Sequence, residues 1–191
     1  NRLVIDTENK NIPDNMVYTL SDCQSEVMTF ITLAIVNNIK LTIRVTNLDV
    51  LQNILYPELK ILHEMGVNLV LKNNKIIVPK QKQLSGANIR ITHKGIQSDH
   101  QPFMALLLSF ANDKSVIKEM VWRSRFAYVP ELNKLGYSIK KHSNKIIIRP
   151  YKHNILQTDI NLNATDTRAA AVLCIAAIKS GTTVKITNIE N

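Results

Sequence analysis

Two aspartates and an arginine of this chain occupy positions where side chains can bind an anion. Asp99 and Asp166 each stand where a strongly apolar helix is expected to begin, and Arg168 falls in the first turn of the second of these helices. The common role of an aspartate at a helix start is to cap the helix. A cation there opposes the helix dipole, so Arg168 needs Asp166 or a bound anion beside it. The two helix starts are therefore candidate parts of a site for an anionic group.

Two further arginines follow an expected strand. Arg123 and Arg125 flank a serine next to Trp122, in the kind of loop where substrate groups often dock. An arginine fork can hold a phosphate or a carboxylate at two points. The simpler alternative is a solvated loop, and the residue types alone leave both interpretations open.

Other chemistries find little support in the sequence. There is no Walker loop, no dinucleotide-binding glycine motif and no nucleophile-elbow motif. The cysteines Cys23 and Cys174 are interpreted as buried free thiols, and we expect no metal and no cofactor. The histidines show no spacing typical of metal ligands; they are His63, His93, His100, His142 and His153.

Length and charge set broad limits on the protein. A chain of 191 residues forms one large domain or two small ones. A net charge of +9 invites an anionic partner, although a lysine-rich solvated surface explains the charge more simply. No apolar run approaches the roughly 18 residues of a membrane helix, and no signal peptide is visible. We therefore expect no membrane association.

A pattern in the middle of the chain recurs 70 residues later. The recurring positions are Leu62, Met65, Gly66, Asn74, Lys75, Ile76 and Ile77, which match Leu132, Leu135, Gly136, Asn144, Lys145, Ile146 and Ile147. Residues 1–5 resemble 74–78, and 166–189 resemble 99–121. We interpret the chain as three supersecondary units in a single domain, 1–191, truncated at both ends and excised from a longer protein.

The expected elements repeat in the same order in each unit. Pro57 is expected to kink or delay one helix, and Gly66 and Gly136 are expected to end helices. We expect strands at 1–5, 17–20, 41–45, 67–71, 75–78, 88–92, 115–121, 137–141, 145–149, 155–162 and 183–189. We expect helices at 21–37 (capped by Ser21-Asp22), 49–65, 99–111, from 126 or 129 to 135, and 166–179.

Two of these helices are apolar on nearly every face. Residues 103–111 and 169–178 are expected to be buried on all sides, whereas the strands keep a polar, lysine-rich face. The pattern indicates an α/β (α+β) fold of repeated βαβαββ units, with buried helices at the centre and sheets outside.

Three short segments resemble one enzyme family. They are GIQSDHQ at 95–101, RFAYVPEL at 125–132 and DTRAA at 166–170. Their order and separation are similar to those of the UDP-N-acetylglucosamine 1-carboxyvinyltransferases, and the resemblance covers essentially all 191 residues. It implies the inside-out α/β barrel of the enolpyruvyl transferases. It also implies that this chain is one of two domains and that the partner domain is absent.

The resemblance implies an activity. Family members transfer enolpyruvyl from phosphoenolpyruvate to the 3′-hydroxyl of UDP-N-acetylglucosamine and release phosphate, in the first committed step of peptidoglycan precursor synthesis. The chemistry is addition and elimination through a tetrahedral ketal. We expect a cytoplasmic transferase whose substrates are these two molecules, whose other partner is its second domain, and which is inactive as this domain alone.

The resemblance also implies roles for individual residues. Asp99 contacts the sugar hydroxyl and is the expected base, a role typically worth about 10²–10⁴-fold in rate. The backbone of Val121 holds the UDP-sugar, with Trp122 as its aromatic neighbour. The side chains matched to the phosphoenolpyruvate side are Arg125, Asp166 and Arg168, and of these Asp166 is grouped with Asp99 as catalytic.

Departures from the family pattern keep alternatives open. Gln97, Ser98, Arg123 and Thr167 replace a proline, a threonine, an acidic or small residue and a leucine. The family's loop cysteine, its phosphoenolpyruvate-binding lysine and arginine, and its late Asp-Arg-Gly segment lie outside this chain. The main alternative is a diverged paralogue that acts as a binding module or uses another sugar nucleotide. The 5-enolpyruvylshikimate-3-phosphate synthases share the implied fold with different motifs.

Nucleic-acid binding is the third alternative. Lysines cluster at the expected hairpins, but aromatic residues are only 5% of the chain and no recognition motif is present. We therefore expect no nucleic-acid partner.

Overall fold

The structure is a computed structural model that describes residues 22–122, 125–152 and 159–189. Its helices are α1 (Gln24–Asn37), α2 (Leu48–Ile54), α3 (Tyr56–Glu64), the 3₁₀ turn η1 (Ser98–His100), α4 (Gln101–Leu108), α5 (Tyr128–Lys134) and α6 (Thr167–Ser180). Its strands are β1 (Leu41–Arg44), β2 (Val70–Lys72), β3 (Lys75–Val78), β4 (Asn88–Ile91), β5 (Ser115–Glu119), β6 (Ser138–His142), β7 (Lys145–Arg149), β8 (Ile160–Asn163) and β9 (Val184–Thr187). The strands expected at 1–5 and 17–20, and the first part of the one expected at 155–162, lie outside the described residues.

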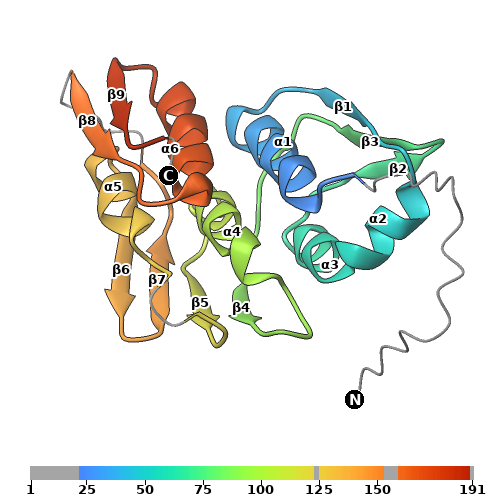
Figure 1. Ribbon diagram of the computed structural model, residues 1–191, viewed down its shortest axis with the longest axis horizontal. Coiled ribbons are helices and arrows are strands. Elements are labelled where there is room, and N and C mark those ends of the chain that lie inside the picture. Colours follow the sequence, from blue (N-terminus) through green and yellow to red (C-terminus); the bar gives the residue numbers. More distant parts are fainter. Residues whose placement is uncertain (1–21, 123–124, 153–158, 190–191) are drawn as a thin grey trace, which may run out of the picture.

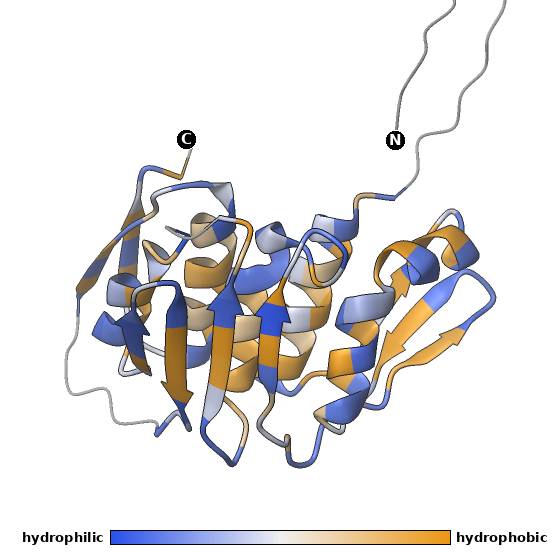
Figure 2. Ribbon diagram, turned by 90° about the horizontal axis from the view of Figure 1, so that it is seen from below, coloured by the Kyte–Doolittle hydropathy of each residue, from blue (hydrophilic) through white to orange (hydrophobic). Residues whose placement is uncertain are grey.

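Three helices form the centre of the molecule. Helices α1, α4 and α6 pack against one another, and the sheets lie around them (Figure 1). Figure 2 shows hydrophobic colouring along the strands and on the helices behind them, and hydrophilic colouring at loops and strand ends. Along β4 and β8 exposed and buried residues alternate, as they do in sheets that bury one face. The expected arrangement of central helices with sheets outside is confirmed.

The described strands form sheets of three, four and two strands, in the orders β1-β3-β2, β4-β5-β7-β6 and β8-β9. The pairs β4–β5 and β8–β9 are parallel, and each is joined by a crossover through a central helix. The hairpins β2–β3 and β6–β7 are antiparallel. The run from β4 to β7 is a complete βαβαββ unit, which confirms the fold class.

The way in which helices α3 and α5 end explains where the hairpins that follow them start. Gly66 and Gly136 have φ of 88° and 82°, and the N–H of the following residue returns to the helix, from Val67 to Leu62 and from Tyr137 to Leu132. These helix-ending bonds satisfy carbonyl groups at the C-terminus. They also occupy the first residues of the strands expected at 67–71 and 137–141, so β2 and β6 begin later than expected.

The start of α1 differs from expectation. Helix α1 begins at Gln24 after Cys23, and no side chain caps it. The carboxylate of Asp22 instead accepts hydrogen bonds from the N–H groups of Thr46 and Asn47, just after β1. The capping role assigned to Asp22 is therefore wrong, because the side chain makes a tertiary contact with the neighbouring loop.

The helix expected at 49–65 is divided in two. Helix α2 starts after Asn47, whose side chain accepts from the N–H of Val50, and it ends at Ile54. Helix α3 then starts with Pro57 in its first turn. Proline is well placed there because it has no N–H to satisfy. The expected effect of Pro57 on this helix is therefore observed as an interruption between α2 and α3.

The two apolar helices differ in burial. Every residue of α4 is buried, as expected. Helix α6 keeps an exposed side, on which Ile178 is 63% exposed and Cys174 is also exposed. The prediction of complete burial is therefore wrong for α6. Cys23 and Cys174 are free thiols, as expected, but both are exposed, so the prediction that they are buried is also wrong.

The two helices offer a matched test of the core. Leu107 on α4 is 0% exposed, so Leu107→Ala is expected to lower the free energy of unfolding by about 2–5 kcal/mol through lost contacts and a cavity. Ile178→Ala on α6 is expected to change it by about 0.5 kcal/mol or less, because the side chain is largely in solvent. Urea denaturation of both variants measures the difference, and equal losses would contradict this description of the core.

Candidate active site

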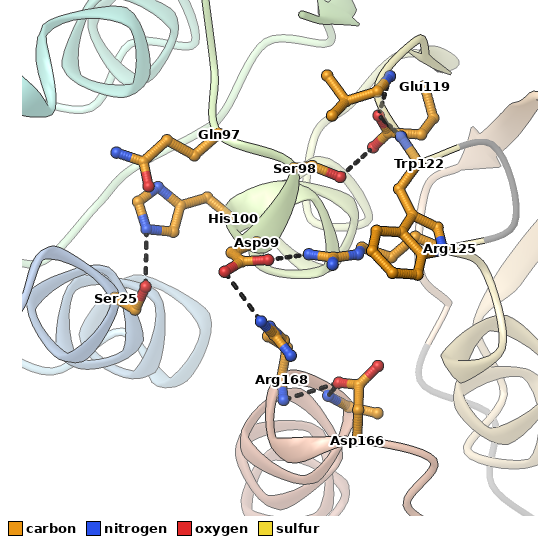
Figure 3. Close-up of polar contacts among 12 residues, drawn as sticks. Ser25, Gln97, Ser98, Asp99, His100, Glu119, Trp122, Arg125, Asp166 and Arg168 are labelled. Carbon is orange, nitrogen blue, oxygen red and sulfur yellow. Dashed lines mark hydrogen bonds and ion pairs between the residues drawn. The ribbon is translucent and has the colours of Figure 1, made fainter. Parts of the chain in front are cut away.

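Asp99 lies in the 3₁₀ turn η1 at the start of α4. Its carboxylate caps no helix; it faces two arginine side chains instead (Figure 3). Arg125 Nη1 donates a hydrogen bond to Asp99 Oδ1, and Arg168 Nη2 donates to Oδ2 at 3.0 Å. The simpler interpretation of Asp99 as an N-cap is therefore wrong.

Asp166 does cap its helix. Its Oδ1 accepts hydrogen bonds from the N–H groups of Arg168 at 2.9 Å and Ala169 at 3.0 Å. The cap fixes the first turn of α6 and with it the origin of the Arg168 side chain. The carboxylate that Arg168 needs at a helix start is supplied mainly by Asp99, and Asp166 adds a weaker attraction. The two aspartates thus play different structural roles.

The charges at this point shift two pKa values. Burial by itself would raise the pKa of Asp99, but the hydrogen bonds from Arg168 and Arg125 outweigh it and hold that pKa below its usual range. The hydrogen bond to Asp99 likewise raises the pKa of Arg168. Asp99 is therefore a carboxylate near neutral pH, with each oxygen held by a different arginine.

Arg125 is held from a second direction by Trp122. Its guanidinium carbon lies 5.2 Å from the centroid of the indole ring, a distance that permits a cation–π attraction. The Arg125 N–H also donates to the carbonyl of Trp122 at 3.0 Å. Arg123 lies outside the described residues, so of the two arginines expected in this loop only the position of Arg125 is described.

Glu119 was not identified from the sequence. This residue is 0% exposed. Its Oε1 accepts from the N–H groups of Val121 at 2.8 Å and Trp122 at 3.1 Å, and its Oε2 accepts from the hydroxyl of Ser98 at 3.0 Å. Glu119 therefore ties the end of β5 to the turn that carries Asp99. The signal available in the sequence was its position on the inward side of an alternating strand.

The N-terminal ends of all three central helices meet at the turn that carries Asp99. Helix α1 reaches the turn through Gln24 and Ser25, which contact the side chains of Gln97 and His100, and α6 reaches it through Arg168 (Figure 3). Each helix start carries roughly half a positive charge. Three such ends and two guanidinium groups concentrate positive charge here, and the carboxylates of Asp99 and Asp166 offset part of it.

A cleft of about 260 Å³ opens beside Asp99. Its lining is made of small, polar and backbone groups and one aliphatic side chain, from Thr92, His93, Gly95, Gln97, Ser98, Asp99 and Val121. Val121 is 46% exposed, and the next residue along the chain, Trp122, is 58% exposed. The structure thus brings together five of the expected site residues, Asp99, Val121, Trp122, Arg125 and Arg168, and places Asp166 behind the last of them.

Within the described ranges, no group of three or more histidine, cysteine, aspartate or glutamate side chains is arranged to hold a metal ion. In the same part of the chain, no helix is long and apolar enough to cross a membrane.

The fold is that of a known class of proteins. Residues 2–191 match the family model described as EPSP synthase (3-phosphoshikimate 1-carboxyvinyltransferase). The enolpyruvyl transferase NikO from Streptomyces tendae has a similar crystal structure, with a TM-score of 0.82 and 30% identity over 91% of this chain and 40% of that chain. EPSP synthase from Acinetobacter baumannii shares the fold, with a TM-score of 0.70 and 16% identity over 87% and 41% of the two chains.

Two curated relatives show which enzymes of this class the chain resembles. The UDP-N-acetylglucosamine 1-carboxyvinyltransferase of Pelagibacter ubique is 34% identical over 71% of this chain and 32% of its own length. The second such enzyme of Clostridium acetobutylicum is 34% identical over 67% and 30%. The chain belongs to the EPSP synthase family of enolpyruvyl transferases, and it spans about a third of the length of the curated relatives it matches.

Proposed function

We propose that this chain is one domain of a transferase that moves enolpyruvyl from phosphoenolpyruvate to the 3′-hydroxyl of UDP-N-acetylglucosamine. The observation that carries the proposal is the carboxylate of Asp99, held between Arg125 and Arg168 where three helix N-termini meet. The names of the curated relatives support UDP-N-acetylglucosamine as the acceptor and carboxyvinyl as the group transferred. We further propose phosphoenolpyruvate as the donor, and a role in peptidoglycan precursor synthesis in the cytoplasm.

In the proposed mechanism Asp99 takes the proton of the 3′-hydroxyl. The oxygen attacks C2 of phosphoenolpyruvate while C3 gains a proton, which gives a tetrahedral ketal. Loss of a C3 proton and departure of phosphate then form the enolpyruvyl product. We assign to Arg125 and Arg168 the stabilisation of the phosphate and carboxylate charges, because cations fixed in advance are effective at this task.

Three other residues have supporting roles in this proposal. Asp166 holds the first turn of α6 and borders the phosphoenolpyruvate side through Arg168. Val121 and Trp122 border the sugar nucleotide at the exposed edge of the cleft. The Val121 N–H already donates to Glu119, so contact with the sugar nucleotide would involve other atoms of this residue. The partner domain, which we propose covers the cleft, completes the site.

A second candidate is an enolpyruvyl transferase with a different acceptor. The departures from the family motifs at Gln97 and Thr167 favour a family member of this kind, and the identity to the curated relatives is only 34%. Offering several UDP-sugars to the same preparation separates the two candidates.

The direct test is phosphate release from phosphoenolpyruvate plus UDP-N-acetylglucosamine. The polypeptide that joins this chain to its partner domain is expected to release phosphate, and the 191-residue chain is expected to release none. Silence of the joined polypeptide with this sugar, together with turnover of another UDP-sugar, would support the second candidate. Turnover by the 191-residue chain alone would contradict the proposed need for a partner domain.

A further inference from the structure

A buried glutamate–histidine pair lies directly behind the turn that carries Asp99. Glu58 comes from α3 and His100 ends η1, and both side chains are 0% exposed. The Nδ1 of His100 is 2.8 Å from Oε1 of Glu58. Its Nε2 is 3.2 Å from the hydroxyl of Ser25 on α1. The pair therefore connects three elements at the point where the site is built.

One oxygen of Glu58 holds the turn at two points. Besides His100, Oε1 accepts a hydrogen bond from the backbone N–H of Gln97 at 2.9 Å. These two residues stand on either side of Ser98 and Asp99. On the other side of the turn, Ser98 donates to the buried Glu119. Asp99 therefore lies in a segment of four residues that buried carboxylates fix at three of its positions.

The pair is a weak source of stability. The second oxygen of Glu58 is buried and has no hydrogen-bond partner among the described residues. Two charged or polar groups in a protein interior are often no more stabilising than apolar side chains of similar volume. The contribution that remains is geometric, since the two bonds to Oε1 restrict where the turn can lie.

We propose that Glu58 is a positioning residue that, through His100 and the N–H of Gln97, holds Asp99 at the place where Arg125 and Arg168 both reach its carboxylate. The consequence for catalysis rests on the proposed function, whereas the geometry can be tested on the 191-residue chain by itself.

The test is a titration of the Asp99 carboxyl carbon by ¹³C NMR in the 191-residue chain and its Glu58→Met variant. Methionine keeps most of the volume and removes both acceptors. If Asp99 is displaced from its arginines, its pKa rises by roughly 1 unit, since an adjacent cation lowers a carboxyl pKa by about 1–3 units. Removal of the negative charge of Glu58 alone would instead lower the pKa of Asp99. The sign of the shift therefore separates displacement from simple electrostatics.

Two further variants act as controls. Glu58→Gln keeps an acceptor oxygen at the same place, so the pKa of Asp99 is expected to stay below its usual range. Glu131→Gln removes a carboxylate of α5 that also accepts a backbone N–H, from Asn163 at 2.9 Å, away from the turn. This variant is expected to leave the Asp99 titration unchanged.

A pKa of Asp99 that stays the same or falls in Glu58→Met overturns the proposal. If Glu58→Met shows no cooperative unfolding transition, the double variant Glu58→Met/His100→Leu is titrated in its place, because an apolar replacement of the whole pair is often neutral for stability. The same rise in the pKa of Asp99 in the double variant supports the proposal, and the absence of a rise overturns it.

Turnover gives a second reading in the joined polypeptide. A misplacement of about 1 Å at a reacting group can cost about 10²-fold, so Glu58→Met is expected to lower kcat by that factor, while Glu131→Gln retains it. A raised Asp99 pKa with a silent wild-type enzyme would contradict the proposed function and leave the positioning role intact. An unchanged Asp99 pKa in Glu58→Met, together with an active wild-type enzyme, would contradict the positioning role and leave the proposed function intact.

Discussion

Asp99→Asn is expected to lower the rate of phosphate release by about 10²–10⁴-fold in the joined polypeptide. Asparagine keeps the shape of the side chain and can still accept a hydrogen bond from one arginine, but it cannot take a proton from the sugar hydroxyl. The fold is expected to persist, because Asp99 is 40% exposed at its side chain and caps no helix. The measurement is steady-state phosphate release, with thermal unfolding recorded on the same preparation.

The control for Asp99→Asn is again Glu131→Gln, which makes the same change from carboxylate to amide on α5. Turnover of Asp99→Asn within twofold of the parent would remove Asp99 from the mechanism. A loss of turnover accompanied by an equal loss in Glu131→Gln would point to a general effect on the fold.

Arg168→Lys is expected to reduce turnover by about 10²-fold, the lower end of the effect of removing one fixed donor from a site that stabilises developing charge. Lysine keeps the positive charge and loses the planar guanidinium that presents several N–H groups in a fixed geometry. Because Asp166 still caps α6 through backbone N–H groups, the helix start is expected to stay intact. The loss should appear in kcat and in the KM for phosphoenolpyruvate, with little change in the KM for the sugar nucleotide.

Arg90→Lys provides the matched control for this substitution. Arg90 is an exposed arginine on β4, so the same change of side chain there is expected to leave turnover unchanged. If Arg168→Lys retains full activity, or raises only the KM for the sugar nucleotide, Arg168 does not act on phosphoenolpyruvate.

The repeat in the sequence predicts much of this fold. The equivalent glycines at 66 and 136 end equivalent helices, and the central position of α4 follows from its apolar composition. Helix α6 is equally apolar in sequence, yet one side of it is exposed. Local composition determines which residues can be buried. The packing of neighbouring elements determines which faces of a helix are in fact buried.

The site was predicted in part. The three motifs led to Asp99, Arg125 and Arg168, and the structure brings these three side chains together. The sequence analysis predicted a role for neither Glu58 nor Glu119. Glu58 lies 42 residues from His100 in sequence, and no local pattern links a glutamate of one helix to a turn in the next unit. The position of Glu119 on the inward side of its strand marked it as buried, but its contact with Ser98 is tertiary, and a single sequence does not reveal such contacts.

The three central helices have a consequence for how the protein unfolds. In an open solenoid each repeat contacts only its neighbours, so repeats can unravel from one end. Here α1, α4 and α6 come from three units, and each covers part of the other two. No unit can detach without exposing α4 to water, so the units are expected to share a single cooperative transition. The amide protons of α4 then reach solvent only when the whole domain opens.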